Sequence, residues 1–376
     1  GDVSVAEGGW TSALDGQVDQ IEARQLVALW PEFVAPKPRL WVDENLLAGD
    51  LSDIDLALRL RPGAKPTLYA DFEYARSDIR FHRFMPPITG ATGQTTFIDN
   101  RFVTTVTAGT VTPDQGGPLD VAGSSFIIPD TSIKKAAPGI ARLRIDGPVT
   151  SILSMLNRPP IEVLKGTPLP VDMADGTARL EGTLSVPLKK GAQFGEMQFH
   201  LAGEIQDAQS TVLVPGQQVS ATALQVEGDQ THIALAGTAR IGDLPVVLRW
   251  QQPLGEGGGK SSRVSGQVEL SPRLIDTFNI GLPQGSVSGQ GTGRFTLDLG
   301  PDAPPLLAMQ SDLRGVGLSL PQLGWRKPQD DSGLLDLTGT LGDTARIDHL
   351  TMQAAGLSAT GSVLNKAGGG LDRALL

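Results

Sequence analysis

Two glycine-rich segments have the composition of nucleotide-binding loops, in which main-chain N–H groups at the start of a helix hold phosphate groups. Residues 254–261 (LGEGGGKS) place Leu254 where a phosphate-binding loop needs its first glycine. Residues 289–294 (GQGTGR) lack the last glycine of the dinucleotide-binding pattern. Both segments lead into runs with the alternation of a strand, where these motifs require a helix. We interpret the first segment as a hairpin loop and the second as curved sheet.

The sequence also lacks the residue patterns that are typical of a metal site or of a catalytic nucleophile. His82, His200, His232 and His349 lie far apart, and no pair has the spacing of a metal site. The chain has no cysteine, which excludes disulfides, thiolate metal sites and cysteine nucleophiles. No GxSxG motif occurs, and the sequence places no two carboxylates across a substrate. Carboxylates can assemble from distant positions, so an enzyme stays an alternative, but the sequence favours a protein without catalysis, metal or cofactor.

The charge balance narrows the choice of partners. The chain has 31 Lys and Arg against 41 Asp and Glu, a formal net charge of −10. Such a chain offers no basic field for a phosphate backbone, so we expect no nucleic-acid partner. The same balance argues against the chain lying flat on an anionic membrane, which recruits Lys and Arg.

Composition also limits the fold class. With 46 Gly and 27 Pro among 376 residues, most long helices would be interrupted, so a helical bundle is excluded. A mean hydropathy of −0.05 and a hydrophobic content of 40% are too high for a disordered chain. No stretch approaches the roughly 20 apolar residues that cross a bilayer as a helix. The remaining class is a mainly β protein with many turns.

Three segments carry the features of short helices. Apolar residues from Val18 to Leu29 recur at roughly helical spacing and stop at Pro31, which predicts a helix over residues 17–30. Residues 148–156 begin with a proline at a plausible first helical position and end before two more prolines. Residues 271–278 form a similar interruption between two blocks of strands. The order of strands and short helices suggests a degenerate structural repeat.

From Leu51 onward, most runs alternate apolar and polar residues with a period of two. In residues 178–186, 233–241 and 264–270 the apolar positions include a glycine, while the other positions are polar or charged in most cases. Aromatic residues make up only 5% of the chain, fewer than a densely interlocked core would need. Glycine on the apolar face permits strong curvature or leaves room for a guest.

We therefore predict a mainly β fold, an elongated, curved antiparallel sheet that forms a repeating groove with a few short helices. The predicted parts are an N-terminal helical and linker cap over residues 1–50, a first groove repeat over 51–170, and continuing groove repeats over 171–376. A pair of ordinary β-sandwiches is the alternative, because a second sheet would also hide the apolar faces.

Several landmarks, taken in order, resemble those of one family. They are Trp30-Pro31 after an amphipathic segment, residues 39–49 leading into strands, the helix at 148–156, and Leu184-Ser185-Val186-Pro187-Leu188 at the end of a strand. In this order they resemble the AsmA-like proteins of Gram-negative envelopes, in particular the YhdP-type branch. The Gly-rich alternating strands that follow are similar to the continuing body of such proteins.

The resemblance implies a bridge-like lipid transfer protein. Members of this family have a repeating β-groove that is apolar inside, is anchored in the inner membrane by an N-terminal helix and crosses the periplasm. They are implicated in moving phospholipid toward the outer membrane. For this chain the resemblance implies a periplasmic segment that binds phospholipid, with its anchor and its contacts to both membranes outside these residues, and envelope protein partners that are unknown.

The groove hypothesis names twelve lining residues, chosen from the apolar positions of the alternating strands. Each could equally belong to an ordinary core. The competing hypothesis is a structural or assembly module of the envelope, with dry β-sandwich cores that bind other proteins. The predicted lining residues are Leu180, Leu184, Val186, Phe199, Leu201, Ile205, Ile233, Leu235, Leu248, Val268, Phe295 and Leu297.

Overall fold

The structure is a computed structural model of the 376-residue chain. It describes residues 1–6, 8–32, 35–159, 161–165, 167–189, 191–254, 261–301, 303–321, 324–342, 345–365 and 371–375. Most of the glycine-rich loop predicted over residues 254–261 therefore lies outside the described residues. In the other glycine-rich segment, Gly289 lies in one strand and residues 291–294 in the next, as predicted, and Gln290 connects them.

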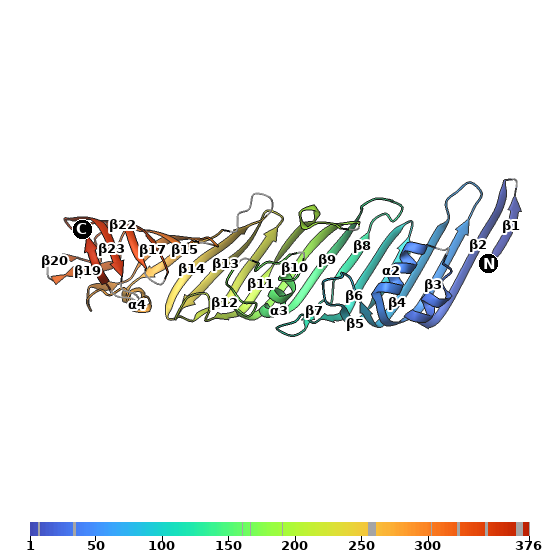
Figure 1. The fold of residues 1–376 in the computed structure, drawn as a ribbon, viewed down its shortest axis with the longest axis horizontal. Helices are drawn as coiled ribbons and strands as arrows, with labels where there is room; N and C mark the ends of the chain where they lie inside the picture. The colour runs from blue at the N-terminus through green and yellow to red at the C-terminus, as the bar shows by residue number, and fades with distance from the viewer. Residues whose placement is uncertain are drawn as a thin grey trace. The chain divides into compact units, whose positions relative to one another are not determined.

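Strands hold 59% of the residues and helices 10%, which confirms the mainly β class. The main sheet has 21 strands and its described pairings are antiparallel, while a second sheet has three strands. Most strands of the main sheet lie beside the strand that follows them in the sequence (Figure 1), whereas β15 pairs with β17 and β18 with β21. Among the described residues, no helix is both long and apolar enough to cross a membrane.

The chain divides into two compact units, and the division falls within strand β11 (Gln198–Ser210). Unit 1 consists of Gly1–Lys165, Pro170–Asp172 and Thr177–Gly203. Unit 2 consists of Gly166–Leu169, Met173–Gly176 and Glu204–Leu376.

Unit 1 is a meander of long strands with three short helices. Its strands are β1 (Asp2–Ala6), β2 (Gly9–Glu22), β3 (Leu46–Leu60), β4 (Thr67–Ile79), β5 (Ile88–Ile98), β6 (Arg101–Val111), β7 (Leu119–Asp120), β8 (Ser125–Ile128), β9 (Ala137–Pro148) and most of β10 (Asp175–Leu188). Its helices are α1 (Ala23–Leu29), α2 (Pro36–Asn45) and α3 (Val149–Leu156), with a 3-10 turn at Phe194–Glu196.

Unit 2 continues with the same kind of meander and adds a small second sheet. Its main strands after β11 are β12 (Val219–Asp229), β13 (His232–Ile241), β14 (Leu244–Pro253), β15 (Ser262–Leu270), β17 (Gly291–Leu299), β18 (Leu306–Ser311), β21 (Gly333–Thr340), β22 (Arg346–Ala354), β23 (Leu357–Asn365) and β24 (Leu371–Leu375). The second sheet contains β16 (Val287–Gly289), β19 (Val316–Leu320) and β20 (Trp325–Lys327), and the helix is α4 (Pro272–Thr277).

Two predicted helices are confirmed by their boundaries. Helix α3 begins after Pro148, which is its N-cap, and α4 begins at Pro272 after the N-cap Ser271. The Ser271 side chain accepts a hydrogen bond from the Arg273 N–H at 3.2 Å, which satisfies one N–H group at the helix start.

The helix predicted over residues 17–30 is wrong in its first part. Residues up to Glu22 belong to β2, where Val18 is paired with Ile54 and Ile21 with Leu51 of β3. Main-chain pairing along β3 satisfies the backbone and outweighs the local helical spacing of the apolar residues. Only Ala23–Leu29 form the helix α1.

Candidate functional site

One face of the unit 2 sheet is apolar from strand to strand. Leu235 of β13 lies opposite Trp250 of β14, Trp250 lies opposite Val264 of β15, and Val264 lies opposite Leu297 of β17. Directly opposite residues of antiparallel strands share a face, so these four side chains form one row across four strands. A parallel row runs from Gly237 through Leu248 to positions farther along the sheet. We call this surface the apolar face of unit 2.

The other face of the same strands carries charged pairs. Arg263 of β15 bonds the carboxylate of Asp298, directly opposite on β17, at 2.5 and 3.0 Å. Arg249 of β14 bonds Glu227 of β12 at 2.5 Å, above the intervening strand β13. These pairs are exposed to solvent, so they contribute little stability and mark the water-facing side of the sheet.

Unit 1 has an equivalent apolar face. Leu184 of β10 lies opposite Ala141 of β9, and Leu180 lies opposite Ile145. Gly182 lies between these two leucines and packs against Leu201 of β11. The row through Ala141 continues to Phe126 of β8 and ends in two threonines, Thr104 of β6 and Thr95 of β5. Beside it, Ile128, Phe102 and Phe97 form an apolar row across β8, β6 and β5. We call this surface the apolar face of unit 1.

The twelve predicted lining residues all lie on these apolar faces. Leu180, Leu184, Val186, Phe199 and Leu201 are in unit 1, and Ile205, Ile233, Leu235, Leu248, Val268, Phe295 and Leu297 are in unit 2. Eleven of the twelve are half-buried. Val268 is the exception, with 7% of its surface exposed in a packed cluster with Val246 and Leu270. The faces are therefore partly open, whereas a sandwich core would bury most of these side chains.

Glycines on the apolar faces bring neighbouring backbones together. A Cβ added to Gly93 would lie 1.9 Å from the carbonyl oxygen of Thr105, and one added to Gly203 would lie 2.1 Å from that of Arg179. A Cβ on Gly266 would lie 2.0 Å from the carbonyl oxygen of Val247. No side chain fits at such distances, so these glycines permit close approach and curvature. They do not leave empty space for a guest.

One strip of the unit 2 apolar face is covered. Leu244, Val246 and Leu270 are buried, and Leu274 of α4 packs against them together with Trp325 of the second sheet. This covered strip lies at the strand ends from which α4 and the second sheet emerge. The half-buried residues lie farther along the strands, and they form an open strip beside a closed one.

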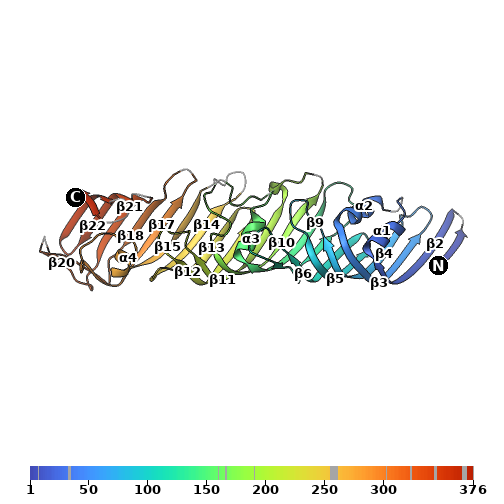
Figure 2. The same ribbon diagram turned by 60° about the horizontal axis from the view of Figure 1, so that its bottom comes forward.

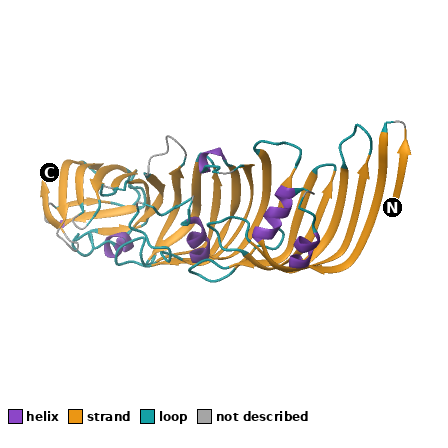
Figure 3. Cartoon of the chain, turned by 45° about the vertical axis from the view of Figure 1, so that its right-hand side comes forward, coloured by secondary structure: helices purple, strands orange, loops and turns teal. Residues whose placement is uncertain are grey.

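The apolar face of unit 1 is partly covered in the same way. Leu26 of α1 packs against the buried residues Leu51, Ile54 and Tyr74. Helices α1 and α2 contact β3 and lie beside β3 and β4 in Figure 2, and Figure 3 shows the short helices in purple against the strands. Met155 of α3 packs on a second buried cluster. The short helices therefore cover part of the apolar face.

The first three strands add open apolar surface that the predicted lining omitted. Trp10, Leu14 and Val18 of β2 share a face with Leu56 of β3, and all four are exposed, Trp10 to 68%. The alternation of Leu14, Gly16 and Val18 is the sequence signal for this strand. The helical interpretation of residues 17–30 concealed it.

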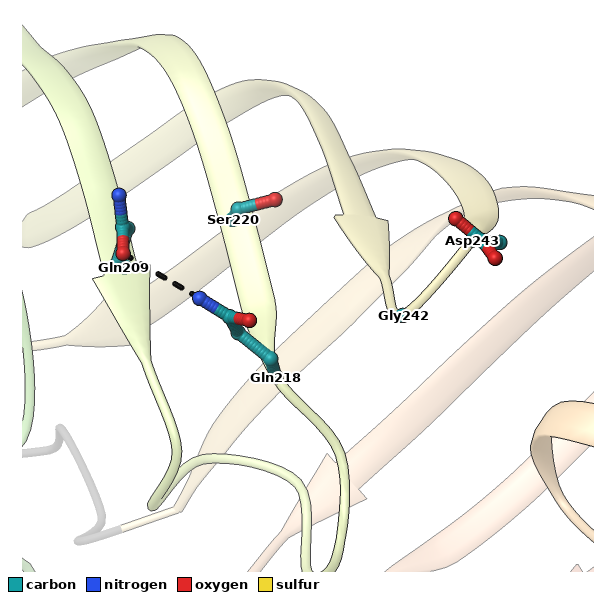
Figure 4. A pocket seen from close by; sticks show the side chains of 5 residues that line it. All are labelled: Gln209, Gln218, Ser220, Gly242 and Asp243. Carbon is teal, nitrogen blue, oxygen red and sulfur yellow. Dashed lines mark hydrogen bonds between the residues drawn. The ribbon is translucent and has the colours of Figure 1, made fainter.

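Two small pockets lie away from the apolar faces. One of about 390 Å³ in unit 2 is lined by Gln209, Gln218, Ser220, Gly242 and Asp243 (Figure 4). Gln218 donates a hydrogen bond from its amide to the Gln209 side chain at 3.3 Å across it. The other, about 280 Å³ in unit 1, is lined by Asp120, Ala122, Gly123, Arg144 and Asp146. Both linings are mainly polar and neither contains a predicted lining residue, so these pockets do not suit an acyl chain.

Buried polar groups in both units serve packing. Tyr74 is buried, its hydroxyl donates to the Thr105 carbonyl at 2.6 Å, and burial raises the pKa of this hydroxyl. Lys327 is fully buried, and its ammonium donates to the carbonyls of Leu313 and Val316 at 2.8 Å and of Pro328 at 2.9 Å. Burial lowers the pKa of Lys327. All three of its N–H donors are used, so the lysine ties turns of unit 2 together.

The described residues contain no group of three or more His, Cys, Asp or Glu that could hold a metal ion. The feature that both units share is a half-open apolar face. No protein-family model, no curated protein and no solved structure matches this chain.

Proposed function

We propose that this chain binds the acyl chains of phospholipids on its apolar faces. The observation that carries the proposal is the partial exposure of eleven of the twelve predicted lining residues, on one face of each unit, opposite a polar face. A large apolar surface that stays partly open to water is typical of a binding surface.

The energetics favour such a ligand. Transfer of an acyl chain out of water is worth about 0.8 kcal/mol per CH₂ group, so a chain of about 16 carbons is disfavoured in water by about 12 kcal/mol. Contact with a continuous aliphatic surface removes much of that cost. Leu, Val and Ile side chains provide no polar anchor, and glycine has no side chain, so a bound acyl chain can slide along the face.

In this mechanism the protein carries out no reaction. The acyl chains lie on the apolar face and the headgroup stays at the solvated edge of the strands. Together with the AsmA-like resemblance, this supports a role as a periplasmic segment that helps phospholipid pass between the inner and the outer membrane. The inferred role is that of a conduit, which needs no catalytic residue, metal or cofactor.

The alternative is a structural module of the envelope that binds other proteins through the same apolar faces. Both functions use partly exposed apolar side chains, so the occupant distinguishes them. A lipid-binding chain carries phospholipid, whereas a protein-binding module is free of lipid when it is pure.

Lipid extraction of the purified chain, followed by mass spectrometry, tests the proposal. We expect phospholipid to co-purify, and the chain to take up a fluorescent phospholipid from detergent-free solution. A native mass spectrum that contains only the unliganded chain, together with no uptake of the fluorescent lipid, would exclude the proposed function.

A further inference from the structure

The loops at one edge of unit 1 concentrate positive charge on an acidic chain. Antiparallel strands alternate in direction, so residues 61–66, 99–100 and 129–136, which follow β3, β5 and β8, lie at the same edge (Figure 1). These loops and the first residue of β6 carry five exposed cationic side chains, which we call the cationic edge. Its members are Arg61, Lys65, Arg101, Lys134 and Lys135.

Interactions between the loops hold the edge together. The Thr131 N–H donates to the Asn100 carbonyl at 2.7 Å, which joins the second and third loops. Asp130 accepts a hydrogen bond from the Ser132 N–H at 2.8 Å. Hydrogen bonds from Ser132 lower the pKa of Asp130, and the charge of Lys65 in the first loop lowers it further. The three loops therefore form one continuous surface.

The cationic edge lacks the ion pairs that its neighbours form. At the same edge, Arg59 bonds Asp15 at 2.6 Å and Lys189 bonds Glu196 at 2.5 Å. Within the part of the chain that the structure describes, none of the five members of the cationic edge forms an ion pair. Four of these cations lie in the three adjacent loops, and Arg101 lies beside them at the start of β6. The five cations outnumber the two carboxylates of the same loops, Asp99 and Asp130, so the edge keeps a net positive charge that is available to an anionic group from outside the protein.

The apolar face of unit 1 reaches this edge. Leu68, the second residue of β4, lies opposite Leu58 and is exposed directly after the first loop. Phe102 of β6 lies opposite Ile128 of β8, the last residue before the third loop. An amphiphile whose chains lie on this face would therefore place its headgroup among the cations.

We infer that unit 1 selects phospholipids whose headgroup carries a net negative charge, with the headgroup held by the cationic edge and the acyl chains on the apolar face. This inference rests on the proposed function and specifies its ligand class. A zwitterionic headgroup carries its own cation beside the phosphate, which offsets the attraction to the lysines and arginines. The net charge of −10 works against contact with an anionic bilayer surface, so a single bound lipid is the occupant.

Competition between two lipids tests the inference. The whole chain is incubated with an equimolar mixture of phosphatidylglycerol and phosphatidylcholine that have the same acyl chains, and the bound lipid is extracted and quantified by mass spectrometry. We expect phosphatidylglycerol to be enriched about threefold or more at low salt, and less at high salt. The triple variant Lys65→Gln, Lys134→Gln and Lys135→Gln should bring the ratio close to one while it binds as much lipid in total.

A charge-matched variant provides the control. Arg294→Gln, Arg314→Gln and Arg326→Gln also remove three exposed cations, from unit 2, and should keep the enrichment. The inference would be overturned if both triple variants lost the phosphatidylglycerol enrichment equally, or if the unmodified chain showed no enrichment. Either result would leave the proposed lipid binding intact. An effect on co-sedimentation with phosphatidylglycerol vesicles, without an effect on the extracted ratio, would make the edge a membrane contact and also overturn it. Absence of any bound lipid would reject the proposed function itself.

Discussion

Leu180 occupies the space that a side chain on Gly203 would need. The Leu180 Cδ2 atom lies 2.7 Å from the position of a Cβ on Gly203, and the carbonyl oxygen of Arg179 lies 2.1 Å from it. A leucine of β10 and a glycine of β11 are therefore matched across two strands of the unit 1 apolar face. The match explains why glycine recurs among the apolar positions of an otherwise aliphatic strand.

Substitution Gly203→Ala should destabilise unit 1. The added methyl group meets a main-chain oxygen, so β11 must shift, which we expect to cost about 1–3 kcal/mol of the free energy of unfolding. Urea unfolding followed by circular dichroism measures this. Gly16→Ala is the control, because nothing lies within 4 Å of a Cβ added to Gly16. Equal stability of both variants would contradict the close approach of β10 and β11.

The double variant Leu201→Asp and Leu235→Asp should lose lipid binding and retain the fold. Both leucines are half-buried on the apolar faces, so a carboxylate there stays hydrated but repels an acyl chain. Uptake of a fluorescent phospholipid measures the loss, and circular dichroism reports the fold. His200→Asp and Thr238→Asp, at exposed positions on the opposite faces of β11 and β13, should leave uptake unchanged. Unfolding of the leucine variant would identify these residues as core.

Substitution Lys327→Met should destabilise unit 2. The change leaves the carbonyls of Leu313, Val316 and Pro328 without the donor that they share. We expect the free energy of unfolding to fall by about 2–4 kcal/mol, because buried acceptors lose their partner and regain no contact with water. Denaturant unfolding measures it, with the exposed neighbour Arg326→Met as the control. A Lys327→Met protein as stable as the unmodified chain would show that the ammonium contributes nothing.

The turn between β12 and β13 should weaken in acid. Hydrogen bonds from Thr231 lower the pKa of Asp229 from 3.8 to about 2. The pKa of Asp229 is lower in the folded than in the unfolded state. Its contribution to the free energy of unfolding is therefore complete above the unfolded value of 3.8 and is lost as the pH falls toward 2. Carboxyl NMR titration measures this pKa directly.

Two variants of this turn make the prediction specific. Thr231→Val removes the hydroxyl that donates to Asp229 Oδ1 at 2.6 Å, so the pKa of Asp229 should rise toward 3.8. Gln230→Ala, at the exposed position between them, should leave the pKa near 2. If both variants shift the pKa equally, the hydroxyl is not the main cause.

Local pattern predicts most of the strands because each one has a polar and an apolar face. The alternation of Ile233, Leu235 and Gly237 places these residues on one face wherever β13 pairs. Proline restricts helices locally, so the start of α3 after Pro148 is also visible in the sequence. Residues 17–22 show the limit, because their apolar spacing fits a helix while pairing with β3 makes them a strand.

The sequence by itself determined that this chain builds an antiparallel sheet with one apolar face, because side-chain alternation is a property of each strand alone. Only the tertiary structure decided which part of that face is open. Val268 and Leu235 have the same pattern, yet Val268 packs in the cluster that α4 and the second sheet cover, and Leu235 is half-buried. Covering segments come from distant positions in the chain, and packing between distant segments leaves no local trace in a strand's own residues.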